Sequence, residues 1–224
     1  MEQINNMIQS DYFDKGTQFS ASDFTIPNYQ LWVKKNCAKN EDDKQSLPAW
    51  VGQLVHKASY DTPEIGVIKE FSGVRYIDIG DVEFVSIGGS IDRIECDEDM
   101  VWQIADIKTQ GMFPAKKAFK DKGKDEWNTQ LSVYRWILDG YNLNTCDTGL
   151  IHQYVMGFTK NKDGMEDYNK MEIPLMSLDD TEQMILNKID IATGEEPLFM
   201  DCPVWMCNSY CSYNKSCPSH NKGA

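Results

Sequence analysis

The sequence has few positive charges for its length. It holds 22 Lys and Arg against 35 Asp and Glu, a formal net charge of −13 at pH 7. This balance argues against a protein that coats nucleic acid without specificity, because binding to phosphates needs cations. No apolar run approaches the length of a membrane span. The N-terminus has neither a basic segment nor an apolar one, so we expect no signal peptide and a soluble, cytoplasmic chain.

The chain also lacks the even cysteine spacing of a disulfide scaffold. At 224 residues it suits one domain, or one domain with a small appendage, and it can bury a real core. Four of its seven cysteines fall near the C-terminus, namely Cys202, Cys207, Cys211 and Cys217. In an intracellular chain such a cluster indicates metal binding rather than disulfides.

Two neighbouring segments are predicted to be β-strands, and each of them carries an aspartate. Residues 82–95 and 101–108 are rich in β-branched and aromatic residues, and a polar turn separates them. An antiparallel pair would bring Asp92 close to Asp106, and Lys108 would share the face of Asp106 because strand side chains alternate. Converging carboxylates repel each other unless a cation lies between them, and hard divalent cations prefer oxygen ligands. This pattern predicts a site for a divalent metal.

Two predicted helices carry further polar residues at a spacing of four. Pro48 opens the first helix, which places Gly52 and His56 on one face. The second helix is expected over residues 126–139, capped by Asp125, with Gln130 and Tyr134 on one face. Taken alone, His56 would be a core or surface histidine, and Tyr134 would simply be part of a core stripe.

Lysines crowd the segment after the second strand. Six lysines lie between positions 108 and 124, against the single acid Asp121. We interpret the segment from about Gly111 to Lys124 as a loop, and a solvated loop is the ordinary explanation of such a run. Its position directly after the Asp-x-Lys strand favours contact with DNA phosphates through Lys116, Lys117, Lys120 and Lys122.

Together these motifs resemble the PD-(D/E)XK nucleases. The sequences Gly-Ser-Ile-Asp-Arg-Ile around Asp92 and Ala-Asp-Ile-Lys-Thr around Asp106 and Lys108 resemble the RecB-like branch. That branch includes CRISPR-adaptation exonucleases and AddB-type nuclease domains. Gly52 with His56 and Gln130 with Tyr134 resemble two further RecB-like motifs. Together with the cysteine-rich tail, these make five motifs in the expected order. The resemblance covers the chain from about Ser20 to Cys217.

The resemblance implies a role for each of these residues. His56, Asp92, Asp106 and the backbone carbonyl of Ile107 would hold one or two ions, Mg or Mn. Lys108 would orient the attacking water. Gln130 and Tyr134 are the remaining catalytic residues. Gln130 would hold the scissile phosphate or the metal-bound water, and Tyr134 would brace the site or the DNA strand.

The cysteine tail resembles that of the iron–sulfur RecB-like nucleases. By that resemblance Cys207, Cys211 and Cys217 would bind a 4Fe-4S cluster together with Cys37, which lies at the end of a predicted N-terminal helix. Zinc is the alternative, because Cys202 with the three tail cysteines would make a self-contained four-cysteine site.

We therefore expect an α/β fold with a PD-(D/E)XK core, in which a mixed sheet is flanked by helices and followed by a Cys-rich metal-binding segment. The expected division is an N-terminal helical segment carrying Cys37 (1–47), a RecB-like nuclease core (48–196) and a Cys-rich tail packed on the core (197–224). The expected function is metal-dependent hydrolysis of DNA, as an exonuclease, in repair, recombination or CRISPR adaptation.

Two other classes of function stay open. One is a catalytically silent DNA-binding or scaffold protein, and the other is an unrelated zinc-binding interaction module. The expected partner is DNA, single-stranded or with free ends. The sequence has no helicase motifs, so any unwinding would come from a helicase or from a recombination or adaptation protein.

Overall fold

The fold is built on one mixed β-sheet. The computed structural model describes residues 17–39, 47–60, 66–80, 84–96, 98–157, 165–198 and 211–218. Within these residues the sheet has six strands in the order β1-β3-β4-β5-β6, and β2 pairs with β3 off this path. The strands are β1 (Phe19–Ser20), β2 (Val67–Asp78), β3 (Phe84–Cys96), β4 (Trp102–Gly111), β5 (Thr148–Met156) and β6 (Tyr168–Pro174).

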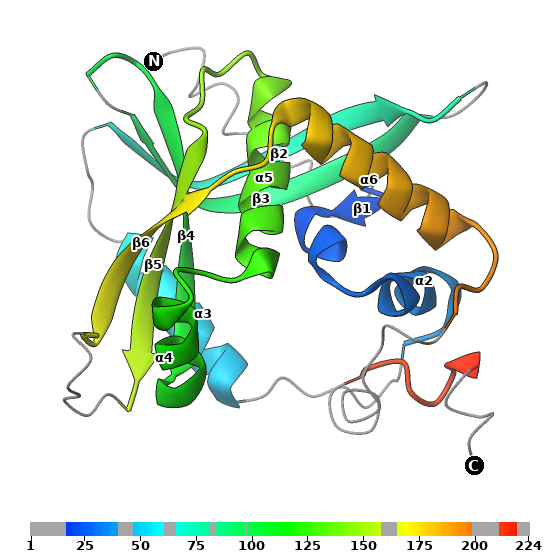
Figure 1. The fold of residues 1–224 in the computed structure, drawn as a ribbon, viewed down its shortest axis with the longest axis horizontal. Coiled ribbons are helices and arrows are strands. Elements are labelled where there is room, and N and C mark those ends of the chain that lie inside the picture. The colour runs from blue at the N-terminus through cyan, green and yellow to red at the C-terminus, as the bar shows by residue number, and fades with distance from the viewer. Residues whose placement is uncertain are drawn as a thin grey trace.

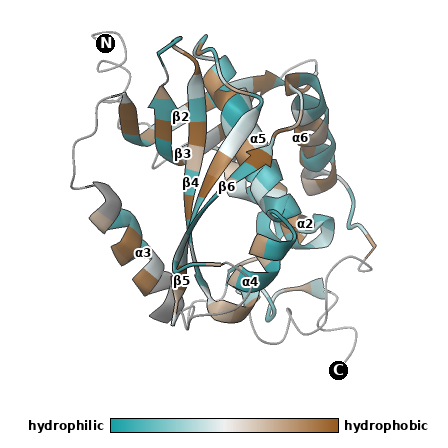
Figure 2. Ribbon diagram, turned by 60° about the vertical axis from the view of Figure 1, so that its left-hand side comes forward, coloured by the Kyte–Doolittle hydropathy of each residue, from teal (hydrophilic) through white to brown (hydrophobic). Residues whose placement is uncertain are grey.

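Helices flank the sheet on both sides. They are the 3-10 helix η2 (Ala21–Thr25) and the α-helices α2 (Asn28–Asn36), α3 (Leu47–Tyr60), α4 (Met112–Lys120), α5 (Asp125–Asp139) and α6 (Leu178–Thr193). Figures 1 and 2 show α3 on one side of the strands and α4 and α5 on the other. The mixed sheet flanked by helices agrees with the fold class predicted from the sequence.

The strand directions explain where the connections run. β3 and β4 are antiparallel and can follow each other through a short turn. β4 and β5 are parallel, so the chain must cross over between them. That crossover contains α4 and α5, which places both helices beside the strand that carries Asp106 and Lys108.

Both faces of β3 are buried near Asp92. Ile91 and Ile94 lie three apart and so point to opposite faces, and both are fully buried, as expected for a central strand of a sheet with helices on both sides. On the partner strand β2, Glu70 has φ 53°, and it lies between the pairs Lys69–Arg93 and Phe71–Ile91. A non-glycine residue rarely adopts this conformation, and such strain concentrates at functional sites.

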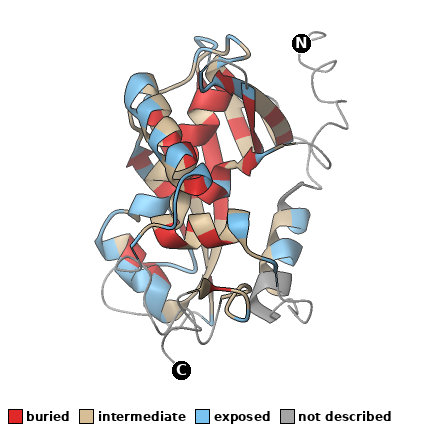
Figure 3. Cartoon of the chain, turned by 90° about the vertical axis from the view of Figure 1, so that its right-hand side faces the viewer, coloured by how far each residue is buried: buried red, intermediate tan, exposed pale blue. Residues whose placement is uncertain are grey.

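Helix α5 is the centre of the core. Trp127, Leu131, Tyr134 and Leu138 form a buried stripe at helical spacing, and Trp136 and Ile137 are buried as well. The helix is apolar over a wide arc because the sheet covers one side and α6 packs on another. Figure 3 shows the exposed outer side of the helices and the buried strands behind them.

Several predicted element bounds are corrected by the structure. The segment from Gly111 to Lys124, which we expected to be a loop, contains the helix α4. Helix α5 begins at Asp125 and has Lys124 at its N-cap, so Asp125 is not the cap. The predicted N-terminal helix is two pieces, η2 and α2, with Pro27 between them. The division into segments 1–47, 48–196 and 197–224 stays a prediction, although β1 of the first segment pairs with β3.

No helix among the described residues is both long enough and apolar enough to span a membrane.

Candidate active site

The site lies where β3 and β4 stop pairing. The ladder between these strands runs from Cys96–Trp102 to Arg93–Ala105, and Asp92 and Asp106 are the next residues along. Beyond the ladder the backbone N–H of Ile107 donates to Asp92 Oδ2 over 2.8 Å. The Asp92 carboxylate thus accepts a hydrogen bond from a backbone N–H that would otherwise continue the β3–β4 ladder. This contact holds Asp92 beside the strand that carries Asp106.

Asp106 is a buried carboxylate, with only 3% of its surface exposed. Burial raises the pKa of Asp106 to about 6, and the neighbouring charge of Asp92 adds to the rise, while Lys108 and His56 oppose it. Lys108 Nζ lies 2.7 Å from Asp106 Oδ2. Despite this ion pair, Oδ2 has no donor in hydrogen-bond geometry among the described residues. A metal ion at this oxygen would have to take the place of the Lys108 ammonium.

His56 reaches the site from α3 on the other side of the sheet. Its Nδ1 lies 3.3 Å from Asp92 Oδ1. The hydrogen bond to Asp92 raises the pKa of His56 against the opposing effect of burial, with smaller contributions from Asp106 and the backbone of Ile107. The structure thus brings together His56, Asp92, Asp106 and Ile107, the four residues whose role as metal ligands stays a prediction.

A chain of hydrogen bonds connects the site to α5. Lys108 Nζ donates to Gln130 Oε1 over 2.9 Å, and Gln130 Nε2 donates to the hydroxyl of Tyr134 over 2.9 Å. Gly89 of β3 lies against the Tyr134 ring, where an added Cβ would stand 2.7 Å from a ring carbon. In this geometry Gln130 fixes the Lys108 ammonium, and Tyr134 fixes Gln130.

The donors at the site suit a hard divalent cation. Two carboxylates, one imidazole and a backbone carbonyl are ligands that Mg and Mn accept. In the described residues no three His, Cys, Asp or Glu side chains stand in a metal-holding arrangement. Lys108 lies against Asp106, while His56 and the Ile107 N–H lie against Asp92. The donor types fit a metal, and the Lys108 ammonium beside Asp106 would have to make room for it.

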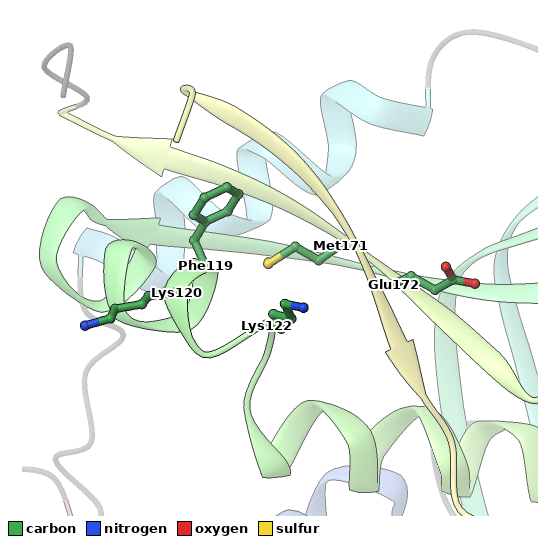
Figure 4. A pocket seen from close by; sticks show the side chains of 5 residues that line it. All are labelled: Phe119, Lys120, Lys122, Met171 and Glu172. Atoms are coloured by element: carbon green, nitrogen blue, oxygen red, sulfur yellow. The ribbon is translucent and has the colours of Figure 1, made fainter. Parts of the chain in front are cut away.

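The predicted DNA-binding lysines lie on or just after α4. Lys116, Lys117, Lys120 and Lys122 are all exposed, and α4 starts directly after β4 ends. A pocket of about 400 Å³ lies between the end of α4 and β6, lined by Phe119, Lys120, Lys122, Met171 and Glu172 (Figure 4). Sequence reasoning missed Phe113 on this helix, which is 88% exposed. Its spacing of three and four from Lys116 and Lys117 would have been the signal.

The structure also brings Cys37 to part of the cysteine tail. Cys37 packs against a small cluster that contains buried Cys217, and Ser216 Oγ donates to the Ala38 carbonyl over 2.5 Å. Burial, followed by the neighbouring Cys217, Glu196 and Cys211, raises the pKa of the Cys37 thiol. Two cysteines of the predicted metal sites, Cys202 and Cys207, lie outside the described residues.

Comparisons with known proteins bear on the fold and the family of the chain. No curated protein matches the chain. A solved structure described as "Crystal structure of SSO0001" matches with a TM-score of 0.61 and 15% identity, covering 98% of this chain and 92% of that one. At this identity the likeness shows the fold alone. The sequence profile of the PD-(D/E)XK nuclease superfamily matches residues 33–218, which span both carboxylates, Lys108 and α5. The chain therefore belongs to the PD-(D/E)XK nuclease superfamily.

Proposed function

We propose that this protein is a divalent-metal-dependent deoxyribonuclease that degrades DNA from its ends, as an exonuclease of the RecB-like branch. Nucleases of its superfamily are generally metal-dependent and typically use Mg or Mn. The observation that carries the proposal is the convergence of Asp92, Asp106 and Lys108 at the end of the β3–β4 ladder. The RecB-like assignment rests on His56 and on the Gln130–Tyr134 pair, which stand beside that convergence.

The proposed ligands of the metal are His56, Asp92, Asp106 and the carbonyl of Ile107. A divalent ion bound there would lower the pKa of a water molecule and offset negative charge on the phosphate. The buried Asp106 carboxylate contributes most to this role, because charges interact more strongly where water is excluded. His56 adds an imidazole, which shifts the preference from Mg towards Mn.

The residues on α5 hold the proposed catalytic lysine in place. Lys108 is poised to orient the water and to offset charge that develops on the phosphate. The ammonium makes contacts with Asp106 on one side and Gln130 on the other, so its position is defined before substrate arrives. Tyr134 limits the rotation of Gln130 through its hydroxyl. In this proposal Gln130 and Tyr134 act mainly by positioning Lys108.

The main alternative is a catalytically silent DNA-binding or scaffold protein with the same fold. Incubation with end-labelled single- and double-stranded DNA, with and without Mn, separates the two. We expect metal-dependent loss of label from the wild type, and none from Asp106→Asn or Lys108→Ala, although both variants remain folded. Metal-independent binding without cleavage, or full cleavage by both variants, would contradict the nuclease proposal. Circular DNA that resists cleavage would support action from ends.

For the C-terminal cysteines we propose a 4Fe-4S cluster bound by Cys37, Cys207, Cys211 and Cys217. The support is the proximity of Cys37 to Cys211 and Cys217, because a zinc site using Cys202 would leave Cys37 without a role. Anaerobic purification followed by visible absorption and metal analysis tests it. A colourless protein with one zinc, lost in Cys202→Ser but kept in Cys37→Ser, would contradict the cluster.

The setting we propose is cytoplasmic DNA repair, recombination or CRISPR adaptation. DNA with free or single-stranded ends would be the substrate. A helicase, or a recombination or adaptation protein, would supply any unwinding. Co-purification of a tagged protein with such a partner, reduced by nuclease treatment if DNA bridges them, would test the association.

A further inference from the structure

One face of α4 combines an aromatic ring with several cations. Phe113, Lys116, Lys117 and Lys120 recur at intervals of three and four, which places them on one side of the helix. All four are exposed, and the Phe113 side chain is 88% exposed. On the opposite side, Ala115 and Ala118 are fully buried against the rest of the protein. The outer face of α4 is therefore the surface made by Phe113 and the three lysines.

This face stands close to the candidate active site along the chain. The end of β4 at Gly111 lies three residues beyond Lys108, about 10 Å at 3.3 Å per residue. Helix α4 starts at the next residue, and Phe113 is in its first turn. A strand of nucleic acid that crosses the outer face of α4 reaches Lys108 within a few nucleotides.

The chemistry of the face fits an unpaired strand. Lysines attract phosphates, and their local excess stands out in a chain with a net charge of −13. An exposed aromatic ring offers a surface on which a base can stack, and stacking tolerates any base because every base has a π-face. In a duplex the faces of the bases are already stacked on one another, so the ring has access mainly to unpaired bases.

We propose that Phe113 stacks on an unpaired base and that the outer face of α4 guides a single DNA strand into the site at Asp92, Asp106 and Lys108. This inference rests on the proposed function for its substrate. It adds a specific contact, and with it a preference for single-stranded over double-stranded ends.

Two other exposed aromatic side chains of the described residues lack this setting. Tyr76 and Phe84 are 63% and 70% exposed near the far end of the β2–β3 pair. The nearby Arg75 is occupied by Asp139 and the face of Trp136. Phe84 is therefore the matched control, because it is an exposed phenylalanine on a sheet strand without a row of lysines beside it.

The test is binding without catalysis. Fluorescence anisotropy in EDTA compares wild type, Phe113→Ala, Phe113→Trp and Phe84→Ala on a labelled single-stranded oligonucleotide and on a blunt duplex. We expect Phe113→Ala to weaken single-strand binding by about 5- to 100-fold, Phe113→Trp to restore it, and Phe84→Ala to bind like the wild type. Duplex binding should change less than about twofold. The salt dependence should stay parallel to that of the wild type, because no charge is removed.

A base-resolved version locates the contact. Abasic positions placed one at a time along the oligonucleotide should weaken wild-type binding at one or two positions, and they should have no further effect on Phe113→Ala. Wild-type affinity in Phe113→Ala, an equal loss on single strands and duplexes, or no single-strand binding by the wild type would overturn the proposal. The assay needs no cleavage, so a silent protein that still shows the Phe113 effect would refute the nuclease function alone.

Discussion

The Asp106 carboxylate shows how one residue joins stability to function. Its pKa is raised to about 6 mainly by burial, so the folded state holds this proton more tightly than the unfolded chain does. Ionisation of Asp106 therefore lowers the stability of the fold as pH rises from about 3.8, the ordinary pKa of an aspartate, to about 6. A bound cation would remove much of this cost. The folded protein with Asp106 ionised would thus be less stable without a bound metal than with one. Catalytic carboxylates commonly have pKa values shifted in this way.

A substitution at His56 tests whether this histidine, which reaches the site from α3, is a metal ligand. We expect His56→Ala to reduce cleavage and to weaken the dependence on Mn more than the dependence on Mg, since only Mn draws much on the imidazole. Titration of cleavage rate against each metal measures this. His56→Asn, which keeps a polar side chain near Asp92, serves as the matched variant. Identical titrations for wild type and His56→Ala would show that this histidine is structural.

Glu95 provides a pH test away from the site. Contacts from His152, Arg93 and Lys170 lower the pKa of Glu95 to about 2 against the effect of burial. The closest of them is Arg93 Nε at 2.7 Å, whereas His152 Nε2 is 3.5 Å away. A lowered pKa means that the ionised Glu95 stabilises the fold above about pH 4.5, and that this contribution disappears as pH falls towards 2.

We therefore expect Glu95→Gln to lower the free energy of unfolding by about 1 kcal/mol at pH 7, the scale of a partly exposed ion pair. The difference from wild type should shrink steadily below pH 4.5. Urea unfolding of both proteins at pH 7, 4.5 and 3 measures it. A difference that stays constant over this range would mean that packing, rather than charge, accounts for the effect.

At the scale of elements, the central strands could be predicted because their pattern is local. Alternating β-branched residues identified β3 and β4, and their register follows from a short turn, so the approach of Asp92 to Asp106 could be expected. The bond from Lys108 to Gln130 could not, because it depends on how α5 docks on the sheet. The Glu95 network was missed for the same reason, since its members come from three strands.

Helix α4 was missed because its buried side is made of small residues. Ala115 and Ala118 pack inward, and alanine adds little to an apolar stripe. Pro114 and the lysines around it made the segment resemble a loop. Pro114 in fact lies in the first turn of α4, where proline is tolerated. Strand β1 escaped prediction because it has only two residues.

The packing of β3 on α5 leads to a prediction for Gly89. A Cβ at this position would stand 2.7 and 2.8 Å from two carbons of the Tyr134 ring and 3.1 Å from Ile137. We expect Gly89→Ala to destabilise the protein by about 1–3 kcal/mol, the usual cost of overpacking. Because the ring must move, the Tyr134–Gln130–Lys108 chain should be disturbed and cleavage should fall further than stability alone explains.

Thermal unfolding and single-turnover cleavage of Gly89→Ala measure both effects. The control is Gly111→Ala, since a Cβ at Gly111 meets nothing within 4 Å and its φ of −68° suits alanine. Wild-type stability in Gly89→Ala would show that the ring yields without strain.

At the scale of the whole molecule, the segment before α3 is fastened to the far end of the chain. Helix α2 packs on α6, where the Tyr29 hydroxyl donates to Glu196 over 2.9 Å and Trp32 Nε1 donates to the Gly194 carbonyl over 3.1 Å. Cys217 packs against Tyr29 in the same cluster as Cys37. The end of α2 and the described part of the tail, residues 211–218, therefore pack together.

This arrangement makes different predictions for Cys37 and Cys202. A centre that uses Cys37 closes a loop of nearly the whole chain, so its loss should destabilise the entire fold. A centre that uses Cys202 closes only a short loop in the tail. We expect Cys37→Ser to lower the melting temperature of the metal-loaded protein by several degrees and to expose α2 to protease, while Cys202→Ser unfolds like the wild type. If Cys202→Ser carries the loss instead, the tail is a self-contained site and the two ends are joined by packing alone.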